Sequence, residues 1–283
     1  MKKLLAAVVV LLALVGVLLL SLPTILHRAG LHPEYDGPSV ALPGKRALII
    51  TTSHGVLAAP GETEGPATGV FGSEMTHPYY TFLDGGMEVD VASIRGGEIP
   101  IDPGSFLFMI KTPEDERYLN DPIAQAKVKN SIPIAEVDID QYDVVFMSGG
   151  WGAAYDLAQS PELAAKVSES YYGDKAAVIG GVCHGVLGLV NARDRDGKLL
   201  IAGRRMTGVT DKQVKELDIE ITPLHPETEL RKAGVVFESQ TAFKDIFATH
   251  VTVDDEQRFV TGQNQNSGLE TAHTMMRILN ERD

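Results

Sequence analysis

The stretch VIGGVCHGVLGLV, residues 178–190, decides the fold and contains the only cysteine in the sequence. Its apolar opening has the composition of a buried strand in a parallel sheet. Gly181 and Gly185 then frame Cys183 in the pattern Gly-x-Cys-x-Gly, the cysteine counterpart of the nucleophile elbow found at a sharp strand-to-helix turn. The pattern predicts a strand that ends just before Cys183 and a helix that begins at His184.

A cysteine at such a turn projects over the carboxyl ends of the strands, where α/β proteins place their sites. We expect the N-terminus of the following helix to lower the pKa of the Cys183 thiol and favour the thiolate. His184 is placed to act as a base or to stabilise charge on the sulfur. These residues indicate nucleophilic catalysis, with a small apolar side chain packed in the core as the alternative.

The rest of the chain alternates between strand and helix patterns. Apolar runs that close on glycine or polar residues predict strands, and capped segments of helical period predict helices. This alternation predicts an α/β fold with a mostly parallel sheet. The expected strands cover residues 46–52, 87–94, 142–150, 176–181 and two within 250–264, and the expected helices cover 74–86, 160–172, 211–220 and 268–282.

Two other segments supply candidate site residues. One expected strand ends in Gly149 and Gly150, whose unobstructed N–H groups are suited to hold an oxyanion beside Cys183. Glu74 begins a helix after a glycine-rich loop, where its carboxylate can exchange a proton with the thiol or with substrate. The alternatives are a plain strand-to-helix turn for the glycines and a complement to the helix dipole for Glu74.

Charge and composition exclude several classes of function. The net charge of −13 disfavours a nucleic-acid partner, because an acidic surface repels phosphates. One cysteine excludes an internal disulfide and any zinc site that needs two thiolates. No histidine pair has the spacing of a metal site, so no metal is expected.

His54, just after the first strand, is a candidate for the pocket wall, with a hydrogen-bonded or solvated role as the alternative.

The first segment of the chain predicts a membrane anchor. Residues 4–23 carry no charge, and a spanning helix needs roughly 20 apolar residues. Lys2 and Lys3 favour a cytoplasmic N-terminus, which places the remainder in the periplasm or on the outer face of a membrane. A cleaved signal peptide is the alternative. The expected organisation is a transmembrane signal anchor over residues 1–23, a linker over 24–45 and one soluble domain over 46–283.

Taken together, these stretches resemble the DJ-1/PfpI superfamily, and more closely its Hsp31-like branch of glutathione-independent glyoxalases and chaperones. The resemblance covers about residues 46–280. It is carried by LIITTSHG, TGVFGSEMTHPYYTFLDGGMEVDVASIRGGEIPIDPGS, YDVVFMSGGWGAAYDL, AAVIGGVCHGVLGLV and FVTGQNQNS.

The resemblance implies a flavodoxin-like (class I glutamine amidotransferase-like) sandwich with Cys183 as nucleophile on a strained elbow. Glu74 matches the acid that hydrogen-bonds the sulfur, and His184 matches the histidine after the cysteine. Gly150 and the backbone of His184 match the amides that bind an oxyanion. A third, acidic partner is expected after RMTGVT, with Asp211 as the first choice and Glu216 as the second.

Two features qualify the resemblance. Trp151 stands where many Hsp31-like members carry a histidine in a GGHG motif, which removes a proton carrier and narrows the mouth of the site. His225, Pro226 and Glu227 resemble the His-Pro-Glu of class I glutamine amidotransferases. Because almost sixty residues follow, His225 is expected instead to cap or precede a helix.

The resemblance implies a glyoxalase III-like lyase (D-lactate dehydratase) that converts a small 2-oxoaldehyde of the methylglyoxal type into a 2-hydroxy acid. No cofactor is expected, because one carbon is oxidised as its neighbour is reduced. Two alternatives stay open: a cysteine amidase or peptidase, and a non-enzymatic redox sensor or holdase at the membrane. Family members are often dimers, so a homodimer is an expected partner state.

Overall fold

A seven-stranded sheet in the order β3-β2-β1-β4-β5-β9-β8 forms the centre of the protein in this computed structural model, which describes residues 2–282. All neighbouring strands pair in parallel except β8 and β9. The inner order β2-β1-β4-β5-β9 is the flavodoxin-like arrangement. The strands are β1 (Arg46–Thr51), β2 (Glu88–Ser93), β3 (Ile132–Pro133), β4 (Val144–Met147), β5 (Val178–Val182), β8 (Val251–Val253) and β9 (Phe259–Gly262).

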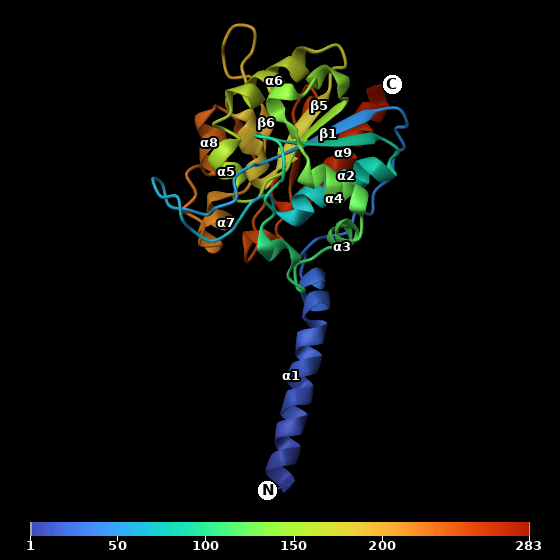
Figure 1. The fold of residues 1–283 in the computed structure, drawn as a ribbon, viewed down its shortest axis with the longest axis vertical. Helices are drawn as coiled ribbons and strands as arrows, with labels where there is room; N and C mark the ends of the chain where they lie inside the picture. The colour runs from blue at the N-terminus through green and yellow to red at the C-terminus, as the bar shows by residue number, and fades with distance from the viewer. Residues whose placement is uncertain (1, 283) are drawn as a thin grey trace.

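Helices cover both faces of this sheet (Figure 1). The helices α2 (Gly72–Asp84) and α9 (Gly268–Arg282) pack together on one face, and α6 (Pro161–Tyr172) covers the other. The remaining helices are α3 (Pro113–Leu119), α4 (Pro122–Lys129), α5 (Ala153–Asp156), α7 (Asp211–Glu216) and α8 (Pro226–Lys232), and β6 (Arg205–Met206) and β7 (Val236–Phe237) form a small parallel pair.

Burial on both faces explains why the central strands are apolar throughout. In β1, Ile49 packs into the core under α2 and α9, whereas Leu48 and Ile50 pack into the core under α6. In the first of these cores, Phe82 of α2 meets Phe146 of β4 edge to face, with 6.2 Å between ring centroids. A parallel strand with two covered faces needs apolar residues at every position.

The expected elements are largely present, with local differences around the cysteine. Ser160 caps α6, as predicted, by accepting the N–H of Leu163 at 3.1 Å. The expected α-helix after Cys183 is instead a 3-10 helix, Cys183–Leu189. Its glycines explain the difference, because a Cβ on Gly185 would lie 2.2 Å from the carbonyl oxygen of Met147. The segment is therefore held against β4 and has low intrinsic helix propensity.

The N-terminal helix α1 (Lys2–Arg28) projects from the domain as a rod (Figure 1). It buries no residue, and it is long and apolar enough to cross a membrane by length and composition, with a mean hydropathy of 3.1 in its most apolar window. The expected linker is not free where it leaves the helix. The N–H of His32 donates to Asn266 Oδ1 at 2.8 Å, and Asn266 Nδ2 donates to the carbonyl of Gly30 at 3.0 Å.

Candidate active site

Cys183 lies at the carboxyl end of β5 in a left-handed backbone conformation, with φ of +56°. For a residue other than glycine this conformation costs about 1–2 kcal/mol, so the surrounding structure must impose it. Gly181 permits the close packing before the turn, because a Cβ there would lie 2.3 Å from the carbonyl oxygen of Met147. The elbow predicted from the sequence is present, and Cys183 is buried there, with 6% of the residue exposed.

Glu74 approaches this thiol from the first turn of α2 and is itself buried. Burial raises the pKa of Glu74 to about 8, while the facing Cys183 thiol and the N–H groups of Gly149 and Gly150 act in the opposite direction. Glu74 Oε2 has no hydrogen bond of normal geometry. A Cβ on Gly149 would lie 2.3 Å from that oxygen, so glycine is required for the carboxyl group to fit.

Burial also raises the pKa of the Cys183 thiol, and the negative charge of Glu74 raises it further. The N–H groups of His184 and Gly150 face the sulfur and favour the thiolate, but they do not reverse the effect of burial. The expected lowering of the thiol pKa is therefore wrong for this enclosed site. A short 3-10 helix also lacks the dipole on which that expectation depended.

His184 is completely buried beside the cysteine, with Nδ1 3.5 Å from Sγ. Burial, together with the nearby His225, lowers the pKa of His184 to about 3. The imidazole is therefore neutral at physiological pH. Its Nε2 is buried without a partner among the described residues.

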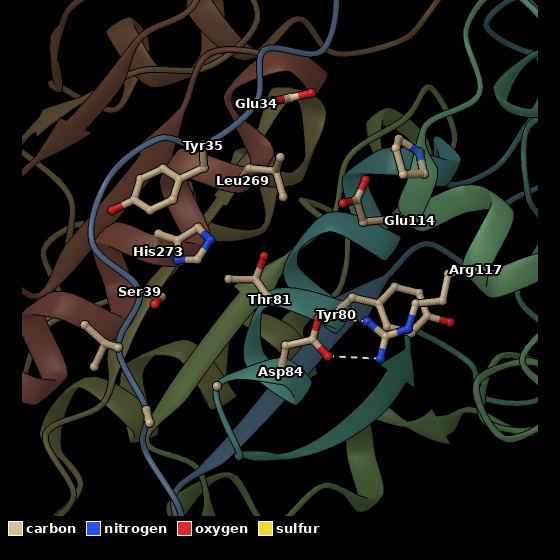
Figure 2. A pocket seen from close by; sticks show the side chains of 14 residues that line it. Glu34, Tyr35, Ser39, Tyr80, Thr81, Asp84, Glu114, Arg117, Leu269 and His273 are labelled. Atoms are coloured by element: carbon tan, nitrogen blue, oxygen red, sulfur yellow. Dashed lines mark hydrogen bonds and ion pairs between the residues drawn. The ribbon is translucent and has the colours of Figure 1, made fainter.

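A cavity of about 390 Å³ opens over these groups. Cys183, Glu74, His184, Gly150 and Trp151 all contribute to its wall. A second cavity, of about 600 Å³, lies elsewhere, between the segment after α1 and the helices α2, α3 and α9 (Figure 2). Its wall includes Tyr35 stacked on His273 and the Asp84–Arg117 ion pair, and it does not reach the cysteine. Cys183, Glu74 and the residues whose N–H groups face the sulfur thus lie together in the first cavity.

A family model described as the DJ-1/PfpI family matches residues 67–276. The chain belongs to the DJ-1/PfpI family. Glyoxalase 3 of Candida albicans is 30% identical over 226 residues, covering 76% of this chain and 91% of that protein. Glutathione-independent glyoxalase HSP31 of Saccharomyces cerevisiae is 31% identical over 173 residues, covering 59% of this chain and 69% of that protein. The Hsp31-like resemblance is confirmed by these relatives.

Two solved structures share the fold of this chain. Rapid Encystment Protein 24 kDa of Francisella tularensis superposes with a TM-score of 0.75 at 32% identity, covering 83% of this chain and 99% of that one. Glyoxalase III of Candida albicans superposes with a TM-score of 0.71 at 26% identity, covering 83% of this chain and 97% of that one. The mostly parallel sheet is therefore the DJ-1/PfpI fold.

Neither acid expected as the third partner in this DJ-1/PfpI site contacts His184. Asp211 is exposed, and its Oδ2 accepts the hydroxyl of Thr228 at 2.8 Å. Glu216 Oε2 accepts the N–H of Asp245 at 2.8 Å. Both carboxylates are bonded around α7, and the carboxyl group that faces Cys183 is that of Glu74.

His54 also lies outside the cavity that contains Cys183. Its ring stacks on Tyr155 at 4.1 Å, and its Nε2 contacts the carbonyl of Val56. His225 does not line the cavity either, but it lies near enough to His184 to lower its pKa. It precedes α8, as predicted, without capping it through its side chain, and its Nε2 is buried and unpartnered among the described residues. The feature of the sequence that drew attention to His225 was the His-Pro-Glu motif.

Proposed function

We propose that this protein is a cysteine-dependent, glutathione-independent glyoxalase that converts a 2-oxoaldehyde into a 2-hydroxy acid. One observation carries the proposal: the Cys183 thiol faces the buried carboxyl group of Glu74 and the N–H groups of Gly150 and His184. This arrangement supplies a nucleophile, a proton carrier and donors for an oxyanion. The glyoxalase names of its relatives support the same reaction.

The first step is attack of the sulfur on the aldehyde carbon. Ionised Glu74 accepts the thiol proton as the carbon–sulfur bond forms, and the developing oxyanion is held by the N–H groups of Gly150 and His184. The oxyanion then takes that proton from Glu74, which gives a hemithioacetal and leaves Glu74 ionised again. Because the thiol pKa is raised, the thiolate forms only as substrate is attacked.

Glu74 also carries the second step. With a pKa of about 8 it is a far stronger base than His184, whose pKa is about 3. Glu74 removes the proton from the former aldehyde carbon, giving an enediolate. The hydroxyl proton of that carbon passes to the neighbouring oxygen, and Glu74 returns its proton to the adjacent carbon. The first carbon is thereby oxidised to a thioester as its neighbour is reduced to an alcohol. Water cleaves the thioester and releases the 2-hydroxy acid and the thiol.

The test is consumption of methylglyoxal by the full-length protein without added glutathione, with lactate measured as the product. Cys183→Ala is expected to lower turnover by at least a thousandfold while leaving the fold intact. Full activity in that variant would remove the proposal. Peptide and amide substrates in the same assay test the amidase alternative. A raised thiol pKa disfavours oxidation, which counts against the redox-sensor alternative.

We also propose that α1 is a single-pass membrane anchor with the domain on the extracytoplasmic side. The support is a helix of 27 residues that buries none of them, with Lys2 and Lys3 at its start. Protease added outside intact cells or spheroplasts is expected to digest the domain. Protection of the domain until the membrane is opened would reverse the orientation.

A further inference from the structure

The cavity over Cys183 is partly walled by the chain that leaves the proposed anchor. Leu26, in the last turns of α1, and Leu31, just after it, line the same space as Cys183 and Glu74. Leu31 is buried there. Two hydrogen bonds between Asn266 and this turn, one accepted from the N–H of His32 and one donated to the carbonyl of Gly30, hold the end of α1 at the mouth of the site.

The wall of the cavity is almost wholly apolar. Beyond the catalytic groups it is formed largely by Phe71, Met109, Trp151, Leu217, Ile219 and Phe247. No lysine or arginine lies among the described residues that line it. The carboxylate of Asp102 is already bonded to the hydroxyl of Thr68 and the N–H of Gly104, each at 2.8 Å. The cavity therefore offers no counter-ion for an acidic or phosphorylated substrate.

The size of the cavity exceeds what a three-carbon aldehyde needs. Its volume of about 390 Å³ falls in the range of roughly 300–1,000 Å³ that holds drug-sized ligands. At about 30 Å³ for each water in the liquid, the same space equals roughly a dozen waters. An apolar cavity of this size gains most from an apolar ligand that fills it.

Exposed apolar side chains continue this surface toward the helix. Leu107, Phe108 and Met109 are 54%, 65% and 41% exposed. Phe108 and Met109 line a groove of about 240 Å³ whose other wall is formed by residues of α1 such as Pro23 and His27. Met109 and Ile110 belong to both the groove and the cavity, so apolar side chains border a continuous path from the anchor to the thiol, although Lys111 and His27 also line the groove. Such a surface beside a spanning helix lies at the level of the lipid headgroups.

We propose that the site accepts 2-oxoaldehydes that carry a long alkyl chain and that it draws them from the bilayer in which α1 is inserted. The dicarbonyl end lies over Cys183, the first methylenes fill the cavity, and the rest of the chain leaves past Met109 toward the lipid. This inference rests on the proposed glyoxalase function and adds the substrate class. The chemistry is unchanged, because only the group attached to the ketone differs.

The test uses the full-length protein in phosphatidylcholine vesicles and compares methylglyoxal with hexylglyoxal. Burial of each methylene is worth about fourfold, so partial burial of a hexyl chain is expected to raise kcat/KM at least tenfold. Hexadecylglyoxal is then placed either in the vesicles that hold the protein or in separate vesicles. Turnover is expected only when substrate and protein share a bilayer.

Two variants separate binding in the cavity from simple partition into lipid. Met109→Glu puts a charge on the proposed path at a partly exposed position and is expected to lower the ratio of hexylglyoxal to methylglyoxal kcat/KM at least tenfold. Ile123→Glu, at a 69% exposed position on α4, is the matched control and is expected to leave that ratio unchanged. Partition of substrate into the vesicles is the same for both variants.

The outcomes distinguish this inference from the proposed function. Methylglyoxal turnover that depends on Cys183, with no preference for hexylglyoxal, would overturn the inference alone. Equal turnover of hexadecylglyoxal from shared and separate vesicles would overturn the route through the bilayer. Absence of turnover with every glyoxal would overturn the proposed function itself.

Discussion

Replacing Glu74 by Gln is expected to change how the stability of the fold depends on pH. The pKa of Glu74 is raised from 4.5 to about 8 by burial, so the folded state holds this proton more tightly than the unfolded state. Its contribution to stability is complete below pH 4.5 and is lost as pH rises through about 8. The limiting slope for one such group is about 1.4 kcal/mol per pH unit.

The best window for the measurement lies between pH 6.5 and 8. Burial lowers the pKa values of His32 and His184 to about 3, so these histidines add stability as pH rises from 3 to 6.5 and oppose Glu74 there. Between pH 6.5 and 8 each of them adds only about 0.4 kcal/mol more, because in the unfolded state it is already half deprotonated at pH 6.5. Integration of the Glu74 term then gives a loss of about 1.6 kcal/mol between pH 6.5 and 8.

Urea unfolding of the full-length protein in a mild non-ionic detergent, followed by circular dichroism at both pH values, measures this loss. The glutamine side chain of the Glu74→Gln variant does not ionise. Between pH 6.5 and 8 the free energy of unfolding of the variant is therefore expected to fall less than that of the wild type, by about 1.6 kcal/mol. The difference between the two proteins cancels the titrating groups that do not interact with Glu74, and Cys183, which does, has a pKa raised well above the window. Parallel curves for wild type and variant would refute the raised pKa and the role of Glu74 as a base near neutral pH.

Four other outcomes are expected. Wild-type kcat/KM for methylglyoxal should rise with pH up to about 8, as Glu74 ionises, and a profile that is flat from pH 6 to 9 would exclude Glu74 as the base. Gly149→Ala places a Cβ 2.3 Å from Glu74 Oε2 and should lower kcat at least a hundredfold, whereas near-normal turnover would mean that the carboxyl group is free to move. Phe146→Ala empties the centre of one core and should cost about 3–5 kcal/mol in urea unfolding, with a loss below 1 kcal/mol as the contrary result. Asn266→Ala removes the bonds to the turn after α1 and should speed trypsin cleavage at Arg28 about tenfold, while an unchanged rate would show that the turn is held by other contacts.

The sequence predicted well those elements whose burial is periodic or whose ends are capped. The strand expected over residues 46–52 is β1, Arg46–Thr51, because both faces of it are covered and its residues are apolar in one continuous run. The helix expected after Ser160 begins there because the serine hydroxyl and Pro161 act locally. The elbow at Cys183 could also be predicted from local sequence, because the positions of the glycines determine how closely neighbouring backbone segments can pass.

The parts that the sequence did not predict depend on contacts between distant residues. Nothing local distinguishes Asp211 bonded to Thr228 from Asp211 turned toward His184, because the choice is made by packing of α7 against α8. The thiol pKa was misjudged because the depth of burial is set by the whole cavity. The docking of the turn after α1 joins residues 32 and 266, and no periodic pattern marks such a pair.

The docked turn after α1 has a practical consequence for anyone who expresses only the globular part. A chain that starts after Leu31 would lack one side of the chamber, and water would reach the sulfur. The thiol would then ionise more easily, because hydration favours the anion, and short aldehydes would compete with long ones on nearly equal terms. Kinetics from such a fragment would describe a more reactive and less selective catalyst than the anchored protein.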